Sequence, residues 1–259
     1  MNAGRVLSKG LVRLWLPVLL VAVWWYASAD SSNIYFPPLA TILETFQRDW
    51  LTARALDDLV PSLTKLVIGF LLAAFGGIAL GTLLGLSPRV RSAVEPIMQF
   101  LRSLPPPVLL PIGLLLFGIT GAMNIFIIVF GAIWPTVLNT ADGVRSLPPE
   151  LRDMARSYRL GFRQRLFAVV LPNAAPQIFS GLRVTLQLSI ILIVVSEMVA
   201  AVDGVGFYVL NSQQTFAVAE TWAGTLLLGV IGYLTTLVFL LAQRRVLAWQ
   251  TGMHQTRKA

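Results

Sequence analysis

Few residues of this chain could carry out chemistry. It has no Cys, and its one His, His254, stands in a polar tail, so neither thiolate chemistry nor a histidine metal site is expected. Asp57 and Asp58 are adjacent acids, yet no His and no third acid stands at a spacing that would complete a metal site with them. A membrane enzyme is therefore a weak alternative, and we expect no catalytic residue, no metal and no cofactor bound by this chain.

The lysines decide whether the chain could bind ATP by itself. A phosphate-binding loop of the form G-x-x-x-x-G-K-[ST] requires a Lys. The chain's lysines are Lys9, Lys65 and Lys258, and none of them has that setting. A site for ATP of this kind is therefore not expected in this chain.

The composition places these residues in a membrane protein. Of 259 residues, 56% are apolar and 12% are charged, and the mean hydropathy is +0.75, so polar residues are too few to cover a soluble domain. A spanning helix takes about 20 apolar residues, which leaves room for roughly six spans. We expect an all-α membrane protein with one domain over residues 1–259 and spans near residues 14–29, 59–86, 108–118, 123–141, 182–201 and 222–242.

Two of these segments are unusual. The third follows a proline-rich approach from Pro96 through residues 105–107, and such breaks at membrane depth are tolerated only against protein or a water-filled cavity. The first has the basic start of a signal peptide, but the aromatic residues at 24–26 fit a membrane interface. We therefore expect the first segment to be retained as a span.

The second segment carries small residues at every fourth position. This spacing puts them on one helix face, where another helix can approach the backbone closely. The neighbour could lie in the same subunit or in a second one. The stripe comprises Gly69, Ala73, Gly77, Gly81 and Gly85.

Basic residues are distributed unevenly between the segments. With a cytoplasmic N-terminus, 17 of the 20 Lys and Arg fall on the inner side or at its boundary, Arg89, Arg91 and Arg102 among them. An excess of Lys and Arg marks cytoplasmic connections, so we expect an even number of spans and both termini inside. The same asymmetry explains the pI of 10.6 without nucleic-acid binding.

The connection over residues 142–181 is too long for a simple turn, since bundle connections usually take about 2 to 8 residues. Helical spacings of three and four give it a basic stripe beside an apolar stripe. Such a helix could dock into a groove on a partner protein or lie on anionic membrane lipid, and periodicity alone does not choose between them. The basic stripe is Arg152, Arg156, Arg159 and Arg163; the apolar stripe is Leu151, Met154, Ala155, Tyr158 and Phe162.

The same connection carries a family resemblance. Its run from Asp153-Met154-Ala155-Arg156 through Leu160-Gly161 to Pro172 resembles the EAA loop of the membrane subunits of bacterial ABC importers. The likeness extends from about Ile34 to Trp249 and is to the branch with permeases for aliphatic sulfonates, taurine and nitrate. Asp153 replaces the usual Glu of that loop, Met154 an Ala, and Arg159 stands where most families place Gly. Further matches are Phe36-Pro37-Pro38, Ser62-Leu63, Gly181-Leu182-Arg183, Glu197-Met198 and Gly204-Val205-Gly206-Phe207.

This resemblance implies a permease of the type I ABC importer fold in a bacterial inner membrane. It implies a homodimer of this chain, an ABC ATPase that binds ATP and Mg, and an extracytoplasmic binding protein that delivers a small sulfonate, taurine, nitrate or related organic anion. Residues 144–176 would form the loop that couples to the ATPase. The implied coupling residues are Glu150, Asp153, Met154, Ala155, Arg156, Tyr158, Arg159, Gly161 and Phe162.

Polar residues of the fifth segment are candidates for a translocation pathway, because polar groups inside spans are costly. Thr185, Ser189 and Ser196 share one helix face, although hydroxyls in spans more often pack by bonding to helix carbonyls. Glu197 is ionisable, and it could be a gate, a partner for Lys65 or a solvated end residue.

The fourth segment offers Trp134 and Asn139, on either side of Pro135 and Thr136. With the broken third segment they suggest a cavity wall of aromatic and hydrogen-bonding groups, although Trp134 would fit a core equally well. An ion-gradient-driven secondary transporter remains the alternative function. It predicts inverted repeats and several embedded carboxylates, whereas Glu197 alone is clearly embedded here, and it leaves the stripes of the long connection unexplained.

Overall fold

The computed structural model describes residues 3–51 and 54–249, with side chains from residue 15 onward; His254 and Lys258 lie outside this part. Within it the chain is helical and forms no strand. Turns of π or 3-10 helix join some of the helices: η1 (Ala55–Leu59), η2 (Pro106–Leu109) and η3 (Leu166–Val170). The α-helices are α1 (Ala3–Ser28), α2 (Leu39–Trp50), α3 (Val60–Leu86), α4 (Pro88–Ser103), α5 (Leu110–Phe117), α6 (Gly121–Arg145), α7 (Pro149–Ser157), α8 (Phe162–Arg165), α9 (Leu171–Ala200), α10 (Val205–Gln214) and α11 (Val218–Val246).

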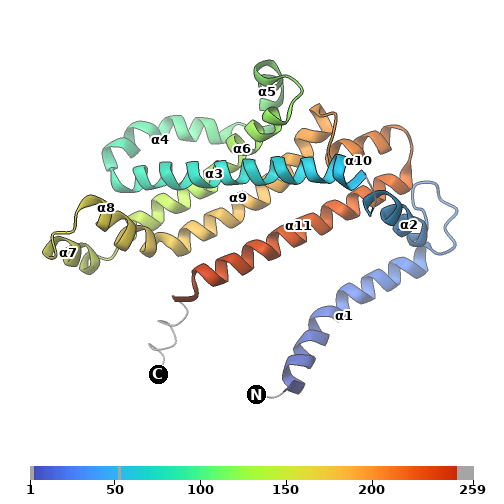
Figure 1. Ribbon diagram of the computed structural model, residues 1–259, viewed down its shortest axis with the longest axis horizontal. Coiled ribbons are helices and arrows are strands. Elements are labelled where there is room, and N and C mark those ends of the chain that lie inside the picture. The colour runs from blue at the N-terminus through green and yellow to red at the C-terminus, as the bar shows by residue number, and fades with distance from the viewer. Residues whose placement is uncertain (1–2, 52–53, 250–259) are drawn as a thin grey trace.

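The core is built by α3, α6 and α9, with α6 packed against both of the others (Figure 1). The small-residue stripe of α3 faces α6 of the same chain. A Cβ on Gly77 would lie 2.8 Å from the side chain of Thr136, and one on Gly85 would lie 2.6 Å from that of Val144. The stripe therefore serves close packing inside one subunit, which was one of its two possible roles.

The predicted third span has a different form from the one expected. Instead of a helix over residues 108–118 alone, α4 begins after the cap of Ser87, whose Oγ accepts from the Val90 N–H at 3.4 Å. It ends at Ser103, because Leu104 precedes a proline and takes an extended conformation (φ −72°, ψ 121°). The chain then turns by 91° into η2 and α5, which is the geometry of a broken span or of a re-entrant loop.

Among the described residues, four helical segments are long and apolar enough to cross a membrane: Ala55–Leu86, Gly121–Arg145, Phe162–Ala200 and Val218–Val246. The bent pair of α4 with η2 and α5 makes a fifth if it is counted as one span. The expected total of about six requires α1 as well, and its described apolar part, Trp15–Ser28, is shorter than a span. The multi-pass helical architecture is confirmed.

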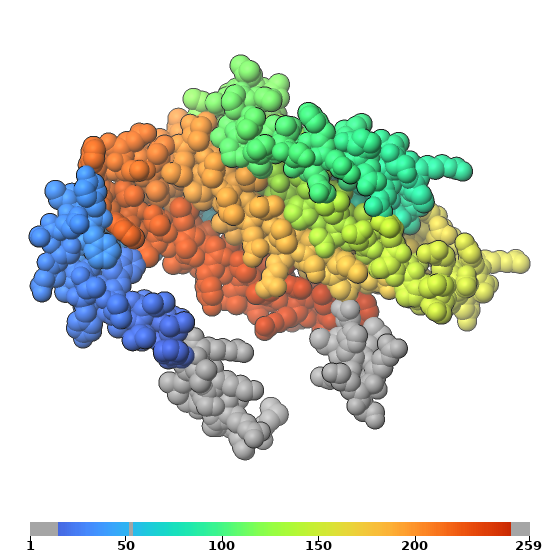
Figure 2. Space-filling view, turned by 180° about the vertical axis from the view of Figure 1, so that it is seen from behind, coloured from blue at the N-terminus to red at the C-terminus, as the bar shows by residue number. Residues whose placement is uncertain are grey.

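The bundle has two distinct ends (Figure 1). One, the α7 end, carries α7 and α8; the other, the α10 end, carries α2, α10 and the start of α3. Viewed from behind, α4 and α5 lie on the outer surface of the bundle (Figure 2). Side chains of α1 from Trp15 onward are mostly exposed, and few of α11 are buried, so these two helices present apolar surface that a membrane or another subunit would cover.

Candidate functional site: a coupling loop and a buried ion-pair cluster

The loop with the basic stripe projects at the α7 end. Ala155 of α7 is 2% exposed and holds the helix against the bundle. Tyr158 and Phe162 are 76% and 61% exposed, and Met154 is 39% exposed, so apolar side chains remain uncovered beside the arginines. The remaining predicted coupling residues are also exposed: Glu150, Asp153, Arg156, Arg159 and Gly161.

The expected single amphipathic helix from Leu151 to Phe162 is wrong. Helix α7 ends at Ser157. Two residues later, Arg159 has a left-handed backbone conformation (φ 51°). The Leu160 N–H donates to the Ala155 carbonyl at 3.0 Å, and the Arg159 N–H donates to the Arg156 carbonyl at 2.9 Å, which is the bonding pattern of a Schellman motif. Glycine adopts this conformation without strain, which gives a physical reason for the Gly that most related families place there.

At the α10 end, Glu197 joins α9 to α3 through an ion pair. Its carboxylate is 1% exposed and lies 2.8 Å from Nζ of Lys65. The Ser62 hydroxyl donates to the same carboxylate, with its Oγ 2.8 and 2.7 Å from the two oxygens. Of the three roles open from the sequence, pairing with Lys65 is the one that the geometry shows.

The loop after α9 closes over this pair. Asp203 lies 2.8 Å from Nζ of Lys65, and the backbone N–H of Gly206 donates to Glu197 Oε2 at 3.1 Å. Gly204 has φ 112°, and a Cβ there would collide with the Glu197 carboxylate. Only glycine fits that position. We name Ser62, Lys65, Glu197 and Asp203 the ion-pair cluster.

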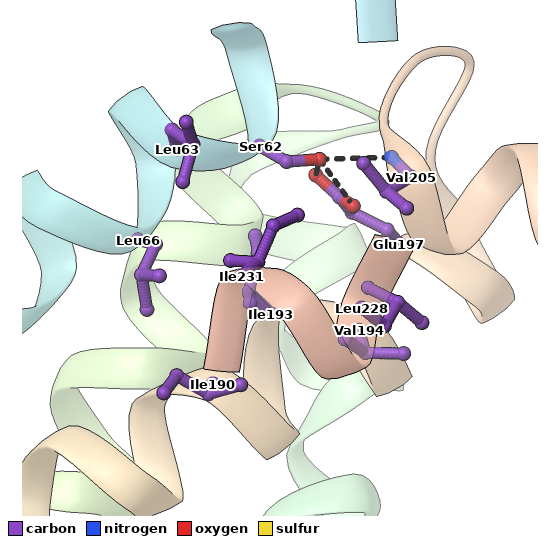
Figure 3. A pocket seen from close by; sticks show the side chains of 10 residues that line it. All are labelled: Ser62, Leu63, Leu66, Ile190, Ile193, Val194, Glu197, Val205, Leu228 and Ile231. Carbon is purple, nitrogen blue, oxygen red and sulfur yellow. Dashed lines mark hydrogen bonds between the residues drawn. The ribbon is translucent and has the colours of Figure 1, made fainter. Parts of the chain in front are cut away.

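A small pocket of about 20 Å³ adjoins the cluster (Figure 3). Ser62, Glu197 and Val205 meet on one side of it, where the Val205 N–H donates to the Ser62 Oγ at 2.9 Å. The rest of its lining consists of aliphatic side chains from α3, α9 and α11. Such a pocket is too small for any solute larger than a water.

The predicted pathway hydroxyls of α9 are buried against α6. Thr185 and Thr136 share a hydrogen bond of 2.7 Å, and Thr185 also donates to the Ala132 carbonyl at 2.8 Å. Ser189 donates to the Thr185 carbonyl at 2.8 Å, and Ser196 accepts from the Asn124 side chain at 2.9 Å. Within one subunit, Thr185 and Ser196 therefore join α9 to α6, whereas the bond of Ser189 stays inside α9.

Trp134 and Asn139 occupy different surroundings on α6. The Trp134 ring is half-buried and meets the ring of Phe130 edge-on at 6.1 Å. Asn139 donates to the Pro135 carbonyl at 2.9 Å, and its Cβ lies beside Gly181 of α9. Of the six predicted pathway residues, Trp134 and Asn139 are the ones with partly exposed side chains.

A second polar group near the α10 end could not be predicted from the sequence. Asp49 of α2 accepts from the Tyr208 hydroxyl at 2.6 Å and pairs with Arg48 Nε at 2.8 Å. Burial disfavours the Asp49 carboxylate, but the bonds from Arg48 and Tyr208 outweigh it and lower its pKa. Burial, with the bond to Asp49, raises the pKa of Tyr208. Their separation of 159 residues carries no local pattern that would have paired them.

Acids and histidines do not form a metal site in the described residues, since no three of them come together. The chemistry available is therefore that of exposed arginines and apolar groups at the α7 end and of buried ion pairs at the α10 end.

The chain is similar to known proteins of one family. Residues 66–249 match the family described as "Binding-protein-dependent transport system inner membrane component". A nitrate import permease protein of Synechocystis is 35% identical over 228 residues, with 85% of this chain and 82% of the relative covered. A bicarbonate transport system permease protein of Synechococcus elongatus is 33% identical over 223 residues, with 82% and 80% covered. A taurine transport system permease protein of Escherichia coli is 30% identical over 238 residues, with 89% and 86% covered.

Among solved structures, a chain of the MetNI methionine ABC transporter in an inward-facing conformation matches with a TM-score of 0.62 at 18% identity. The match covers 80% of this chain and 96% of that one, which shows a shared fold. The expected type I importer permease fold is thus confirmed. The chain belongs to the family of inner membrane components of binding-protein-dependent transport systems.

Proposed function

We propose that this chain is the permease subunit of an ATP-driven ABC importer for a small oxyanion or sulfonate, and that α7 is where the ATPase docks. The observation that carries the proposal is the α7 end, where arginines and the exposed rings of Tyr158 and Phe162 project from a membrane bundle. Anionic lipid could also accommodate both kinds of side chain, and it is the match to binding-protein-dependent transport systems that favours a protein partner here. A protein groove with acidic and apolar walls would use both.

The expected partners are inferred from the family and from the missing phosphate-binding loop. Permeases of ABC importers work with an ATPase, and the sequence offers no phosphate-binding loop, so ATP and Mg belong on that partner. An extracytoplasmic binding protein would deliver the substrate to the α10 end. The α7 end, with its arginines, would then be cytoplasmic, together with both termini, in a bacterial inner membrane.

The pathway is proposed to form between two copies of this chain. The exposed apolar surface of α1 and α11 requires lipid or a second subunit, and Thr185, Ser189 and Ser196 are fully buried within one copy. The partly exposed residues Trp134 and Asn139 would line the proposed pathway. The buried residues would hold the helices that form its wall: Thr185, Ser189, Ser196 and Glu197. Nitrate, bicarbonate and taurine, the substrates named for the relatives, each carry an oxyanion group, and they define the substrate class proposed here.

The docking role is tested by reversing charges on α7. Asp153→Lys and Arg156→Glu should each reduce transport-coupled ATPase activity of the reconstituted complex by about tenfold or more, because each reverses the charge that its side chain presents to the partner. Both side chains are exposed (70% and 71%), so the permease should still fold. Arg244→Glu, at the exposed end of α11, is the matched control and should change coupling less than about twofold.

Coupling that is unchanged in both α7 variants would refute the docking role. Accumulation of solute by the purified chain alone, under a proton or sodium gradient, would favour the secondary-transporter alternative. The substrate is best identified by a calorimetric screen of small anions against the partner binding protein.

A further inference from the structure

The exposed surface of α4 is divided into an apolar and a polar flank. Its inward face packs on α3 and α6 through Val90, Val94 and Met98. One exposed flank carries Ile97 and Phe100, which are 58% and 66% exposed. The other carries Ser92, Glu95, Gln99 and Arg102, whose spacings of 3, 4 and 3 place them on one helix face. We name these four residues the polar flank.

The position of Arg102 along the bundle follows from the neighbours of α4. Met98 packs against the cluster that includes Val137 and Ala141 of α6. Pro106, just after the helix, lies 3.0 Å from where a Cβ on Gly131 would be. Arg102 stands between these two contacts and is therefore level with the stretch from Gly131 to Val137, near the middle of α6 (Gly121–Arg145). The distribution of basic residues predicts Arg102 at the inner boundary, whereas the packing of α4 places it deeper.

An arginine at this depth needs an aqueous or protein environment. A charged side chain at the centre of a bilayer costs about 2.5 kcal/mol or more when it faces lipid. Arg102 lies roughly 21 Å along α4 from Pro88, at a helical rise of 1.5 Å per residue, which is farther than its side chain can reach back to the α7 end. Glu95, the acid on the same flank, pairs with Arg91 at 3.7 Å, and no described acid pairs with Arg102.

The polar flank also lies on the same side as the predicted pathway residue of α6. Arg91 and Glu95 share a small pocket with Leu138, Ala141 and Asp142 of α6, which fixes the direction of the flank. Helices α4 and α6 run in opposite directions, so the next turns of α4 come level with Trp134. The surface of α4 and α5 in Figure 2 is not covered by any other described part of the chain.

We propose that the polar flank lines the translocation pathway and that Arg102 is a contact for the oxyanion group of the substrate at mid-membrane. The guanidinium presents parallel N–H donors that match two oxygens of a nitrate, bicarbonate or sulfonate group, and Gln99 adds a side-chain amide beside it. The apolar flank with Ile97 and Phe100 then faces lipid. This inference rests on the proposed function but names a residue and a depth that the function alone does not supply.

The first test measures water and charge at the flank without requiring transport. The chain has no Cys, so Gln99→Cys and Ile97→Cys each introduce a single thiol into the full complex in proteoliposomes. Gln99→Cys should react with an anionic thiosulfonate at least about tenfold faster than Ile97→Cys, and faster than with a cationic one of equal size. Adding Arg102→Gln should abolish that preference for the anion. Equal slow labelling of both positions would overturn the proposal.

The second test measures transport of labelled nitrate, bicarbonate and taurine by the complete complex with its binding protein. For the probe that the wild type carries, Arg102→Gln should lower uptake by about tenfold or more, the loss expected for one charge-assisted contact. Arg102→Lys should retain part of the rate. Arg89→Gln, an exposed arginine in the first turn of the same helix, is the matched control and should stay within about twofold.

The outcomes separate the inference from the function on which it rests. Uptake that is unchanged in Arg102→Gln, with an active wild type, refutes only the role of Arg102. A wild type that imports none of the three anions refutes the proposed substrate class, while the labelling result still decides whether the flank is aqueous. A defect of Arg102→Gln that appears only in vesicles containing anionic lipid would show that Arg102 binds a lipid headgroup, which also overturns the proposal.

Discussion

The ion-pair cluster shows how two charges are kept inside the bundle. Lys65 has two carboxylate partners, Glu197 and Asp203, each at 2.8 Å. Glu197, in contrast, has Lys65 as its cation and hydrogen bonds from Ser62 and Gly206. The two residues are therefore not equivalent, because removing Lys65 leaves a buried carboxylate without a positive partner, whereas removing the charge of Glu197 leaves Lys65 with Asp203.

This asymmetry predicts unequal effects of two substitutions. Lys65→Met should lower the free energy of unfolding by about 3–5 kcal/mol, and Glu197→Gln should lower it by less. The double variant should be more stable than Lys65→Met alone, because no unpaired charge remains. Unfolding midpoints in one detergent would measure all three.

The surface pair of Arg91 and Glu95 supplies the control for that series. Its side chains are 35% and 45% exposed, so Arg91→Met should cost no more than about 1 kcal/mol. Equal losses in Lys65→Met and Arg91→Met would contradict the buried role of the cluster.

The pairing of Lys65 with Glu197 could be predicted as one possibility, because both are ionisable residues inside apolar segments. It could not choose among the roles of Glu197, since the choice depends on how the Gly204 loop folds back over the carboxylate. It also grouped Thr185, Ser189 and Ser196 correctly on one helix face, but which face meets α6 is decided by packing against a partner helix 49 or more residues away.

At the scale of elements, the fit of α3 against α6 depends on the absence of side chains. A Cβ on Gly81 would lie 2.5 Å from the Val137 carbonyl oxygen, a backbone atom that cannot move without shifting α6. The contact extends from Gly69 to Gly85 and so fixes the register of the two helices along most of their length.

Gly81→Ala is therefore expected to destabilise the bundle by about 1–3 kcal/mol through overpacking. Gly229 of α11 is the matched control, because nothing lies within 4 Å of a Cβ there. Gly229→Ala should be neutral or stabilising by up to about 1 kcal/mol, the difference in helix propensity. Thermal unfolding of both variants in the same detergent checks the pair, and a loss of similar size in both would mean that the close approach has no energetic weight.

The long apolar runs predicted α3, α6 and α11 well, because a helix in a membrane must satisfy its own backbone. Helix α4 was missed as an element for the opposite reason. Its polar flank lowers its hydropathy, so the sequence predicts only a proline-rich segment before the third span there. The early end of α7 could not be predicted, because the helical spacing of basic and apolar residues continues past Ser157. The backbone leaves the helix through the left-handed conformation of Arg159.

For the whole molecule, the two ends of the bundle should lie on opposite sides of the membrane. Ser32 and Ser157 are exposed at the α10 end and the α7 end respectively, and each can be replaced by Cys in a chain that has none. In right-side-out vesicles, a membrane-impermeant maleimide should label Ser32→Cys directly and Ser157→Cys only after permeabilisation. The unsubstituted chain should take up no label.

Labelling of Ser157→Cys in intact vesicles would reverse the orientation and place the proposed ATPase site outside the cell. The uneven distribution of arginines predicted this orientation from the sequence, because it depends on composition rather than on packing. Assembly with a second copy has no such compositional signal, since lipid and protein cover apolar helices equally well.

The helical segment Phe162–Ala200 has a mechanical consequence. Its 39 residues begin beside the exposed loop at one end and include Glu197 at the other, a length of roughly 58 Å at 1.5 Å per residue. A force that the proposed ATPase applies at the first turn would therefore move the whole helical segment as one rigid body and reach the far side of the bilayer. The exception would be bending at η3 or at Pro176. The helix backbone would transmit the movement from one end to the other, without a chain of side-chain contacts.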